Sequence, residues 1–171
     1  MIGDSGVGKT CIIARFTRGT FEPNSPSGSA GFKNKTIELP ELHQNLDLDI
    51  WDTVGQEKYK ALTKYFYQGA KMAILVYDIT IKESFDSVKN YWYEDIKEHA
   101  EEDIIIAIAG NKADKYEKEE VSEQEAREFA ESIGAIFRLT SAQNNSGINE
   151  LFEDLAKNYL DHNSEISSSD R

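Results

Sequence analysis

Residues 3–10, GDSGVGKT, form a glycine-rich segment that fits the pattern G-x-x-x-x-G-K-[ST] at every fixed position. Glycines let the backbone turn so that successive N–H groups face inward and surround a phosphate. Lys9 adds a mobile positive charge for the β- and γ-phosphates of a nucleotide, and the Thr10 hydroxyl can ligate Mg²⁺. The helical pattern that follows would also aim its positive end at the anion. These features predict a phosphate site formed by Ser5, Gly6, Val7, Gly8, Lys9, Thr10 and Cys11.

A second chemical segment is LDIWDTVGQEKY, residues 48–59. Asp52 ends an alternating strand pattern, where its carboxylate could hold Mg²⁺ through a water, and the N–H of Gly55 could donate to the γ-phosphate. Gln56 carries both a donor and an acceptor, so it can orient a water for in-line attack on that phosphate. We therefore predict Gln56 and Lys9 as catalytic residues, and Thr10 and Asp52 as metal ligands.

A base site is indicated by GNKAD, residues 110–114, and TSAQ, residues 140–143. The Asp114 carboxylate can accept hydrogen bonds from guanine N1–H and from the N2 amino group, which adenine lacks. Asn111 could donate to N7, and the N–H of Ala142 could meet O6. The stem of Lys112 could cover the face of the base. The predicted set is Asn111, Lys112, Asp114, Ser141, Ala142 and Gln143.

Short apolar runs at residues 72–77, 104–109 and 135–139 predict the strands that position these segments. Such runs are typical of strands covered on both faces, as in a parallel sheet. Apolar residues alternate with aspartates over residues 46–50, which predicts a strand with one wet face. Residues 33–39 could pair with that strand as an antiparallel addition.

Amphipathic patterns between the runs predict helices. One apolar stripe covers residues 85–96 and another covers residues 148–159. Ser122 and Glu125 form a capping box before a third helix, for which Gly134 is a fitting stop. Strands that alternate with helices in this way favour an α/β sandwich with a mostly parallel sheet.

The chain is expected to form one domain over residues 1–161, followed by a polar and flexible tail over residues 162–171. A strand should precede the loop that begins at Gly3, but only Met1 and Ile2 stand before it. Either the natural chain starts further upstream or the first strand is nearly absent, and we favour the first interpretation.

The net charge of −12 and pI of about 4.7 exclude several function classes. A chain this acidic is repelled by nucleic-acid phosphates and by anionic lipid headgroups, so we expect no nucleic-acid partner. The chain contains no run of 18 apolar residues, so we expect no membrane span. Cys11 is the only cysteine, which excludes an internal disulfide and fits a reducing compartment such as the cytoplasm.

The motifs GDSGVGKT, WDTVGQEKY, YFYQGAKMAILVYDIT, GNKAD and TSAQ make the chain resemble the Ras superfamily of small GTPases, and within it the Rab family. The resemblance covers nearly the whole chain. It implies the Rossmann-like P-loop NTPase fold, a three-layer sandwich with a six-stranded, mostly parallel sheet and about five helices. It also implies GTP/GDP binding with Mg²⁺, slow GTP hydrolysis and a two-state switch in vesicle trafficking.

The same resemblance implies effector, GEF and GAP partners, which would bind through the switch regions and the aromatic residues Phe32, Trp51 and Phe66. It implies a cytoplasmic protein recruited to the cytosolic face of endomembranes. No cysteine lies near the C-terminus, so the prenyl anchor expected of a Rab is missing from this chain.

The segment FEPNSPSGSAGF, residues 21–32, departs from the family because it contains no threonine. Family members use a threonine there to hold the γ-phosphate and Mg²⁺. Its place falls on Ser27 or Gly28, with Ser29 within reach, and we take Ser27 as the third metal ligand. A serine lacks the methyl group that restricts χ1, and the glycines make the loop costly to order.

Three interpretations stay open at this stage. The first is a Rab-like GTPase with slow hydrolysis. The second is a hydrolysis-impaired interaction module with a defective first switch, which could be one part of a larger protein. The third, a P-loop phosphotransferase that uses ATP, is disfavoured by Asp114 and by the scarcity of arginines for a closing lid.

Overall fold

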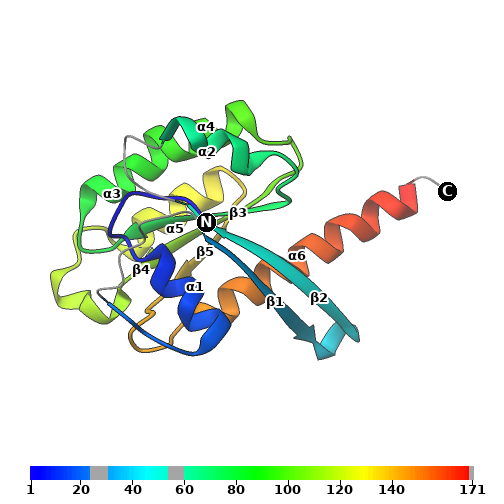
Figure 1. The fold of residues 1–171 in the computed structure, drawn as a ribbon. Helices are drawn as coiled ribbons and strands as arrows, with labels where there is room; N and C mark the ends of the chain where they lie inside the picture. The colour runs from blue at the N-terminus through cyan, green and yellow to red at the C-terminus, as the bar shows by residue number, and fades with distance from the viewer. Residues whose placement is uncertain (24–30, 54–59, 170–171) are drawn as a thin grey trace.

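The computed structural model describes residues 1–23, 31–53 and 60–169, without the side chains of residues 60–63 and 165–169 (Figure 1). Its centre is a parallel sheet with the strand order β3-β4-β5. These strands cover most of the three predicted apolar runs. The predicted burial on both faces is confirmed for β3 and β4, whereas in β5 only Phe137 is buried and Arg138 is exposed. The bounds are β3 Met72–Asp78, β4 Ile105–Asn111 and β5 Ile136–Leu139.

An antiparallel hairpin joins β1, Gly31–Leu39, to β2, Gln44–Asp52, through the 3₁₀ turn η1, Pro40–Leu42. The predicted pairing and the wet face of β2 are confirmed, because Leu48 and Ile50 are buried while the alternating Asp47 and Asp49 are exposed. The buried face of the hairpin packs against α1 and α6.

Helices cover the central sheet on both sides (Figure 1). α3 and α4 are joined by the π-helical segment η3 into one continuous helix over residues 82–99. The bounds are α1 Lys9–Arg18, α2 Lys60–Tyr67, α3 Lys82–Ser87, η3 Val88–Trp92, α4 Tyr93–His99, the 3₁₀ segment η4 Ala113–Lys118, α5 Glu123–Ser132 and α6 Ile148–Ser169.

Alternate residues of β3 pack into two separate hydrophobic cores, one on each face of the sheet, so the fold is a three-layer sandwich. Ile74 and Val76 pack toward α1, α6 and the hairpin. Ala73 and Leu75 pack on the opposite face, toward α5 and the continuous helix. The stripe predicted over residues 85–96 is confirmed, because Phe85, Val88, Trp92 and Ile96 are all buried.

The number of strands differs from the expected six. The described ranges contain five strands, in two separate sheets. Ile2 forms only an isolated parallel bridge with Leu75, in which Ile2 N donates to Ile74 O at 2.9 Å and Val76 N donates to Ile2 O at 2.8 Å. The chain leaves this bridge at once, because the glycine-rich loop begins at Gly3, so the paired stretch is too short for a strand.

The capping prediction for α5 is confirmed on one side: Ser122 Oγ accepts a hydrogen bond from Glu125 N at 3.2 Å. The Glu125 carboxylate instead contacts the ammonium groups of Lys82 and Lys89. Glu125 therefore links α5 to the helix that begins at α3.

α6 extends through most of the segment expected to be a polar tail, since its helix runs to Ser169. Its last turns project away from the body, beside the hairpin (Figure 1), and Lys157 Nζ lies 3.0 Å from Glu41 Oε2 at the hairpin turn. The flexibility of residues 162–171 stays a prediction. Among the helices of the described ranges, none is both long enough and apolar enough to cross a membrane.

Candidate functional site

A cavity of about 360 Å³ opens where the glycine-rich loop enters α1 and where β4 and β5 end. Three segments that lie far apart in the sequence meet there, as expected for the carboxyl edge of a parallel sheet. Three residues that sequence reasoning did not select, Phe21, Pro23 and Lys115, also line it. The complete lining is Gly6, Gly8, Lys9, Thr10, Cys11, Phe21, Pro23, Asn111, Lys112, Asp114, Lys115, Ala142 and Gln143.

The glycine-rich loop needs glycine at position 8 for two reasons. Its φ of 103° is a conformation that other residues rarely adopt. A Cβ atom there would also lie 2.3 Å from Asn111 Nδ2. Gly8 is the N-cap of α1, so the first N–H groups of the helix meet no capping side chain and can receive an anion.

Lys9 is buried below this loop and spans it. Its Nζ donates to Gly3 O at 2.8 Å and to Asp4 O at 3.0 Å. Burial lowers the pKa of Lys9 to about 8, although the charges of Asp52 and Asp4 act to raise it. Phosphate oxygens nearby would favour the charged form of this lysine.

Two oxygen ligands predicted for Mg²⁺ lie together beside Lys9. Thr10 Oγ1 donates to Asp52 Oδ2 at 2.6 Å, which joins α1 to the end of β2. Asp52 Oδ1 is buried and has no hydrogen-bond partner among the described residues. Mg²⁺ prefers oxygen ligands, so this orphaned oxygen and the neighbouring hydroxyl fit the ion. Ser27, the third predicted ligand, lies outside the described residues.

The base segments are tied to the glycine-rich loop by side-chain hydrogen bonds. Asn111 Nδ2 donates to Val7 O at 2.9 Å, and Thr140 Oγ1 donates to Asn111 Oδ1 at 3.2 Å. Ser141 Oγ donates to Asp114 Oδ1 at 2.6 Å. An amide nitrogen carries two hydrogens, so Asn111 can still donate to a base. The Asp114 carboxylate, which is predicted to bind guanine, is thus held by the Ser141 hydroxyl.

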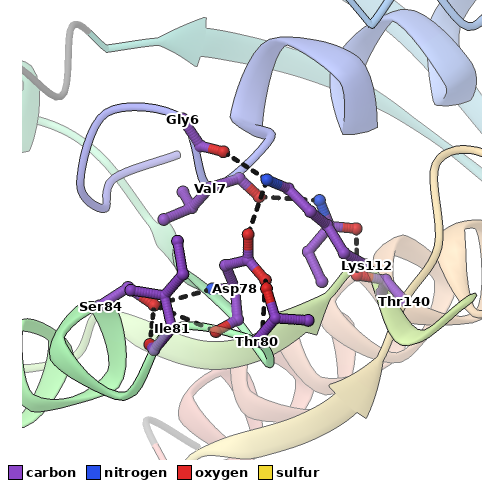
Figure 2. A network of polar contacts seen from close by, with 9 residues as sticks. Gly6, Val7, Asp78, Thr80, Ile81, Ser84, Lys112 and Thr140 are labelled. Carbon is purple, nitrogen blue, oxygen red and sulfur yellow. Dashed lines mark hydrogen bonds and ion pairs between the residues drawn. The ribbon is translucent and has the colours of Figure 1, made fainter. Parts of the chain in front are cut away.

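Lys112 belongs to a polar network that is shown in Figure 2. Its backbone is left-handed, with φ 63°, and its Nζ donates to Gly6 O at 2.8 Å. The same Nζ lies 2.6 Å from Oδ2 of Asp78, a buried residue at the end of β3. Burial raises the pKa of Asp78, but hydrogen bonds from Lys112 and Thr80 outweigh it, and the net pKa is lowered. Asp78 was not predicted as a site residue. The sequence signal that could have indicated it is its place at the carboxyl end of the apolar strand β3.

Arg15 and Trp92 support the site from outside the cavity. Arg15 Nε donates to Ala142 O at 2.7 Å and its guanidinium lies 5.9 Å from the centre of the Phe21 ring. Trp92 Nε1, from the last residue of η3, donates to Asp4 Oδ1 at 2.8 Å. Arg15 also donates to Gln143 O at 3.2 Å, so it fixes the 142–143 loop through two backbone carbonyls.

Some predicted site residues are not brought to the cavity by the described structure. Gly55 and Gln56 lie outside the described residues. Ser5 is exposed and does not line the cavity, whereas Val7 and Ser141 lie just behind its wall and contact residues that do.

The three predicted partner-binding aromatics lie next to one another across β1, β2 and α2. The ring centres of Phe32 and Trp51 are 5.1 Å apart, and those of Trp51 and Phe66 are 5.6 Å apart. Phe32 and Trp51 are each 46% exposed. Together with Phe66 of α2 they form one aromatic cluster on the surface.

Comparison with known proteins agrees with this geometry. A sequence model of the Ras family matches residues 1–161. Human "Ras-related protein Rab-22A" is 45% identical over 92% of this chain and 80% of the relative, and mouse "Ras-related protein Rab-31" shows the same identity and coverage. "Ras-related protein RabC" of Dictyostelium discoideum is 37% identical over 97% of this chain and 91% of the relative. The chain therefore belongs to the Ras family of small GTPases, and within that family it is similar to Rab proteins.

Proposed function

We propose that this protein is a guanine-nucleotide switch that binds GTP and GDP with Mg²⁺, hydrolyses GTP slowly and acts like a Rab in vesicle trafficking. The observation that carries the proposal is the meeting of two motifs at one cavity. The glycine-rich loop provides the phosphate side, and the Ser141–Asp114 hydrogen bond of 2.6 Å orients the carboxylate on the base side.

In this proposal Thr10, Asp52 and Ser27 hold the metal ion, which when bound neutralises charge on the phosphates. The ammonium of Lys9 offsets negative charge between the β- and γ-phosphates, since Lys9 lies directly under the loop. Gln56 orients the attacking water. Arg15 is bonded to the carbonyls of Ala142 and Gln143, so a fast reaction needs an arginine from a partner.

The second candidate is a hydrolysis-impaired interaction module. It is favoured by one observation: the segment of residues 21–32 contains no threonine. A weak clasp on the γ-phosphate would reduce the difference between the GTP-bound and GDP-bound forms.

One experiment separates the two candidates. The protein is loaded with GTP and Mg²⁺, incubated overnight at 25 °C and denatured, and the released nucleotide is identified by ion-exchange chromatography. We expect GDP, which would support the cycling switch. GTP still in place would favour the interaction module, and failure to retain any guanine nucleotide would contradict both.

The Gln56→Leu variant tests the catalytic assignment. We expect turnover to fall at least tenfold while GTP affinity stays near its starting value, because a leucine cannot orient a water. Turnover equal to that of the unmodified protein would remove Gln56 from the mechanism.

We further propose that effectors, GEFs and GAPs bind through the switch regions and the surface of Phe32, Trp51 and Phe66. The proposal is supported by the exposure of the first two rings and by their contact with one another beside α2. By likeness to the Rab relatives, the protein would work in the cytoplasm and at the cytosolic face of endomembranes.

A further inference from the structure

Asp78 is a buried carboxylate for which the nucleotide chemistry above gives no role. Its side chain is 2% exposed, whereas that of Lys112, its ion-pair partner, is 27% exposed. A buried carboxylate is costly unless its oxygens are paired. The two oxygens of Asp78 have different partners. Oδ1 accepts hydrogen bonds from Thr80 and is called the anchored side below, and Oδ2 pairs with Lys112 and is called the holding side.

The anchored side is Oδ1. Thr80 N donates to it at 2.9 Å and Thr80 Oγ1 donates to it at 2.7 Å. The backbone of Asp78 is fixed as well, because its N–H donates to Ser84 Oγ at 3.0 Å. Together these bonds lock the carboxylate in place at the turn between β3 and α3 (Figure 2).

The holding side is Oδ2, which lies 2.6 Å from Lys112 Nζ. A lysine has a flexible four-carbon stem whose position is not fixed by its own geometry. Here the ammonium is held between Asp78 Oδ2 and Gly6 O, so the stem is stretched along the cavity wall and tied to the phosphate loop. The backbone of Lys112 is left-handed as well, a conformation that costs energy in a residue other than glycine.

We propose that Asp78 is a positioning residue for nucleotide retention, which holds Lys112 stretched across the site so that its stem covers the base and its ammonium secures Gly6. The inference rests on the proposed guanine-nucleotide function. Asp78 touches neither base nor phosphate in this role, and acts only through Lys112. Its loss should speed nucleotide release, because an unpaired Lys112 no longer stays in one orientation.

The test uses the Asp78→Asn variant, which keeps the shape of the side chain and an oxygen for Thr80. The release of a fluorescent GDP analogue is followed after addition of excess GDP. We expect release to become at least about tenfold faster with little change in the association rate, as for the loss of one partner of a buried charge pair. Asp154→Asn is the matched control, because it removes the ion pair from Asp154 to Arg138, also 2.6 Å long, away from the cavity.

A double-variant cycle separates positioning from general structural damage. If Asp78 acts through Lys112, the variant with both Asp78→Asn and Lys112→Met releases GDP no faster than Lys112→Met alone. Multiplication of the two separate effects would overturn the proposal. The ratio of GDP to IDP release rates should stay constant in Asp78→Asn, because the 2-amino group is read by Asp114. A changed ratio would mean that the base site itself is disturbed, which contradicts a role through Lys112 alone.

Thr80→Val gives a second, milder test that does not depend on folding of the aspartate variant. It removes the hydroxyl bond to Asp78 Oδ1 and keeps the backbone bond, so we expect a smaller acceleration of release, about threefold. Unchanged release in both Thr80→Val and Asp78→Asn would overturn the proposal. If the unmodified protein binds no guanine nucleotide, the proposed function fails, and with it the inference that rests on it.

Discussion

Individual side chains that line the cavity are held by neighbours that do not line it themselves. Ser141 fixes one oxygen of Asp114, and Asn111 is held by Val7 and Thr140. Fixed hydrogen-bonding groups give strong discrimination between ligands, since a ligand that lacks the matching group leaves them unpaired. The choice of base should therefore depend on the chemistry of Asp114 more than on the size of the cavity.

Asp114→Asn is predicted to change the preference from guanosine to xanthosine nucleotides. The amide offers an N–H donor, which matches the carbonyl at C2 of xanthine and opposes the amino group at C2 of guanine. We expect the ratio of GDP to XDP affinities to fall at least about tenfold in competition for a labelled nucleotide, roughly what one or two hydrogen bonds supply. An unchanged ratio would show that another group reads C2.

The elements of the site are packed so closely that backbone conformation and side-chain contact constrain the same residue. The loop at Gly8 passes directly over Asn111 at the end of β4. Gly69, between α2 and β3, has a comparable left-handed backbone with φ 74° but open space around it. The two glycines therefore separate the cost of the backbone from the cost of the contact.

Gly69→Ala should lower the free energy of unfolding by about 1 kcal/mol, the cost of a left-handed alanine. Gly8→Ala should cost about 3 kcal/mol, because overpacking against Asn111 adds to the same backbone cost. Urea unfolding in excess GDP measures the free energy of unfolding of both variants. Any loss of GDP binding by Gly8→Ala would lower its value further. Equal costs would show that Asn111 moves aside freely.

The whole molecule is held together by two cores, one on each face of the central sheet. On one face the rings of Phe16 and Phe152 are stacked, with centres 3.8 Å apart and planes 11° apart, which joins α1 to α6. Since α1 begins at the phosphate loop, the long C-terminal helix supports the nucleotide site from behind.

Phe152→Ala is predicted to cost about 3–5 kcal/mol of unfolding free energy, as is usual for the loss of a buried phenylalanine. Tyr116→Ala is the control, because Tyr116 is 68% exposed and its loss should change stability by less than about 0.5 kcal/mol. Denaturant titrations of the two variants beside the unmodified protein check this. A small effect at Phe152 would mean that the remaining core closes over the cavity.

Much of this architecture was predictable because its signals are local. Asn111–Asp114 and Thr140–Gln143 each follow an apolar run, so a parallel sheet brings them to one edge. Gly3–Thr10 is marked by its own fixed pattern of glycines, lysine and threonine. The alternation of apolar residues and aspartates around Leu48 is also local, and it predicted which face of β2 is exposed to water.

The features that escaped prediction depend on contacts between distant segments or on patterns with two meanings. Nothing next to Asp78 marks it as the partner of Lys112, and Phe21 stands in a loop without periodicity. The spacing of the 85–96 stripe suits an α-helix and does not reveal the π-helical η3. Residues 162–169 are polar and read as a tail, yet they contain no glycine or proline to end α6.

The bond from Trp92 to Asp4 gives the protein a built-in optical reporter. Of its two tryptophans, Trp92 is fully buried and bonded to the phosphate loop, whereas Trp51 is 46% exposed. Indole emission shifts to shorter wavelengths in apolar surroundings and responds to a change in its hydrogen bond. In a Trp51→Phe variant, the remaining fluorescence should therefore follow the arrival and departure of a nucleotide without any added label.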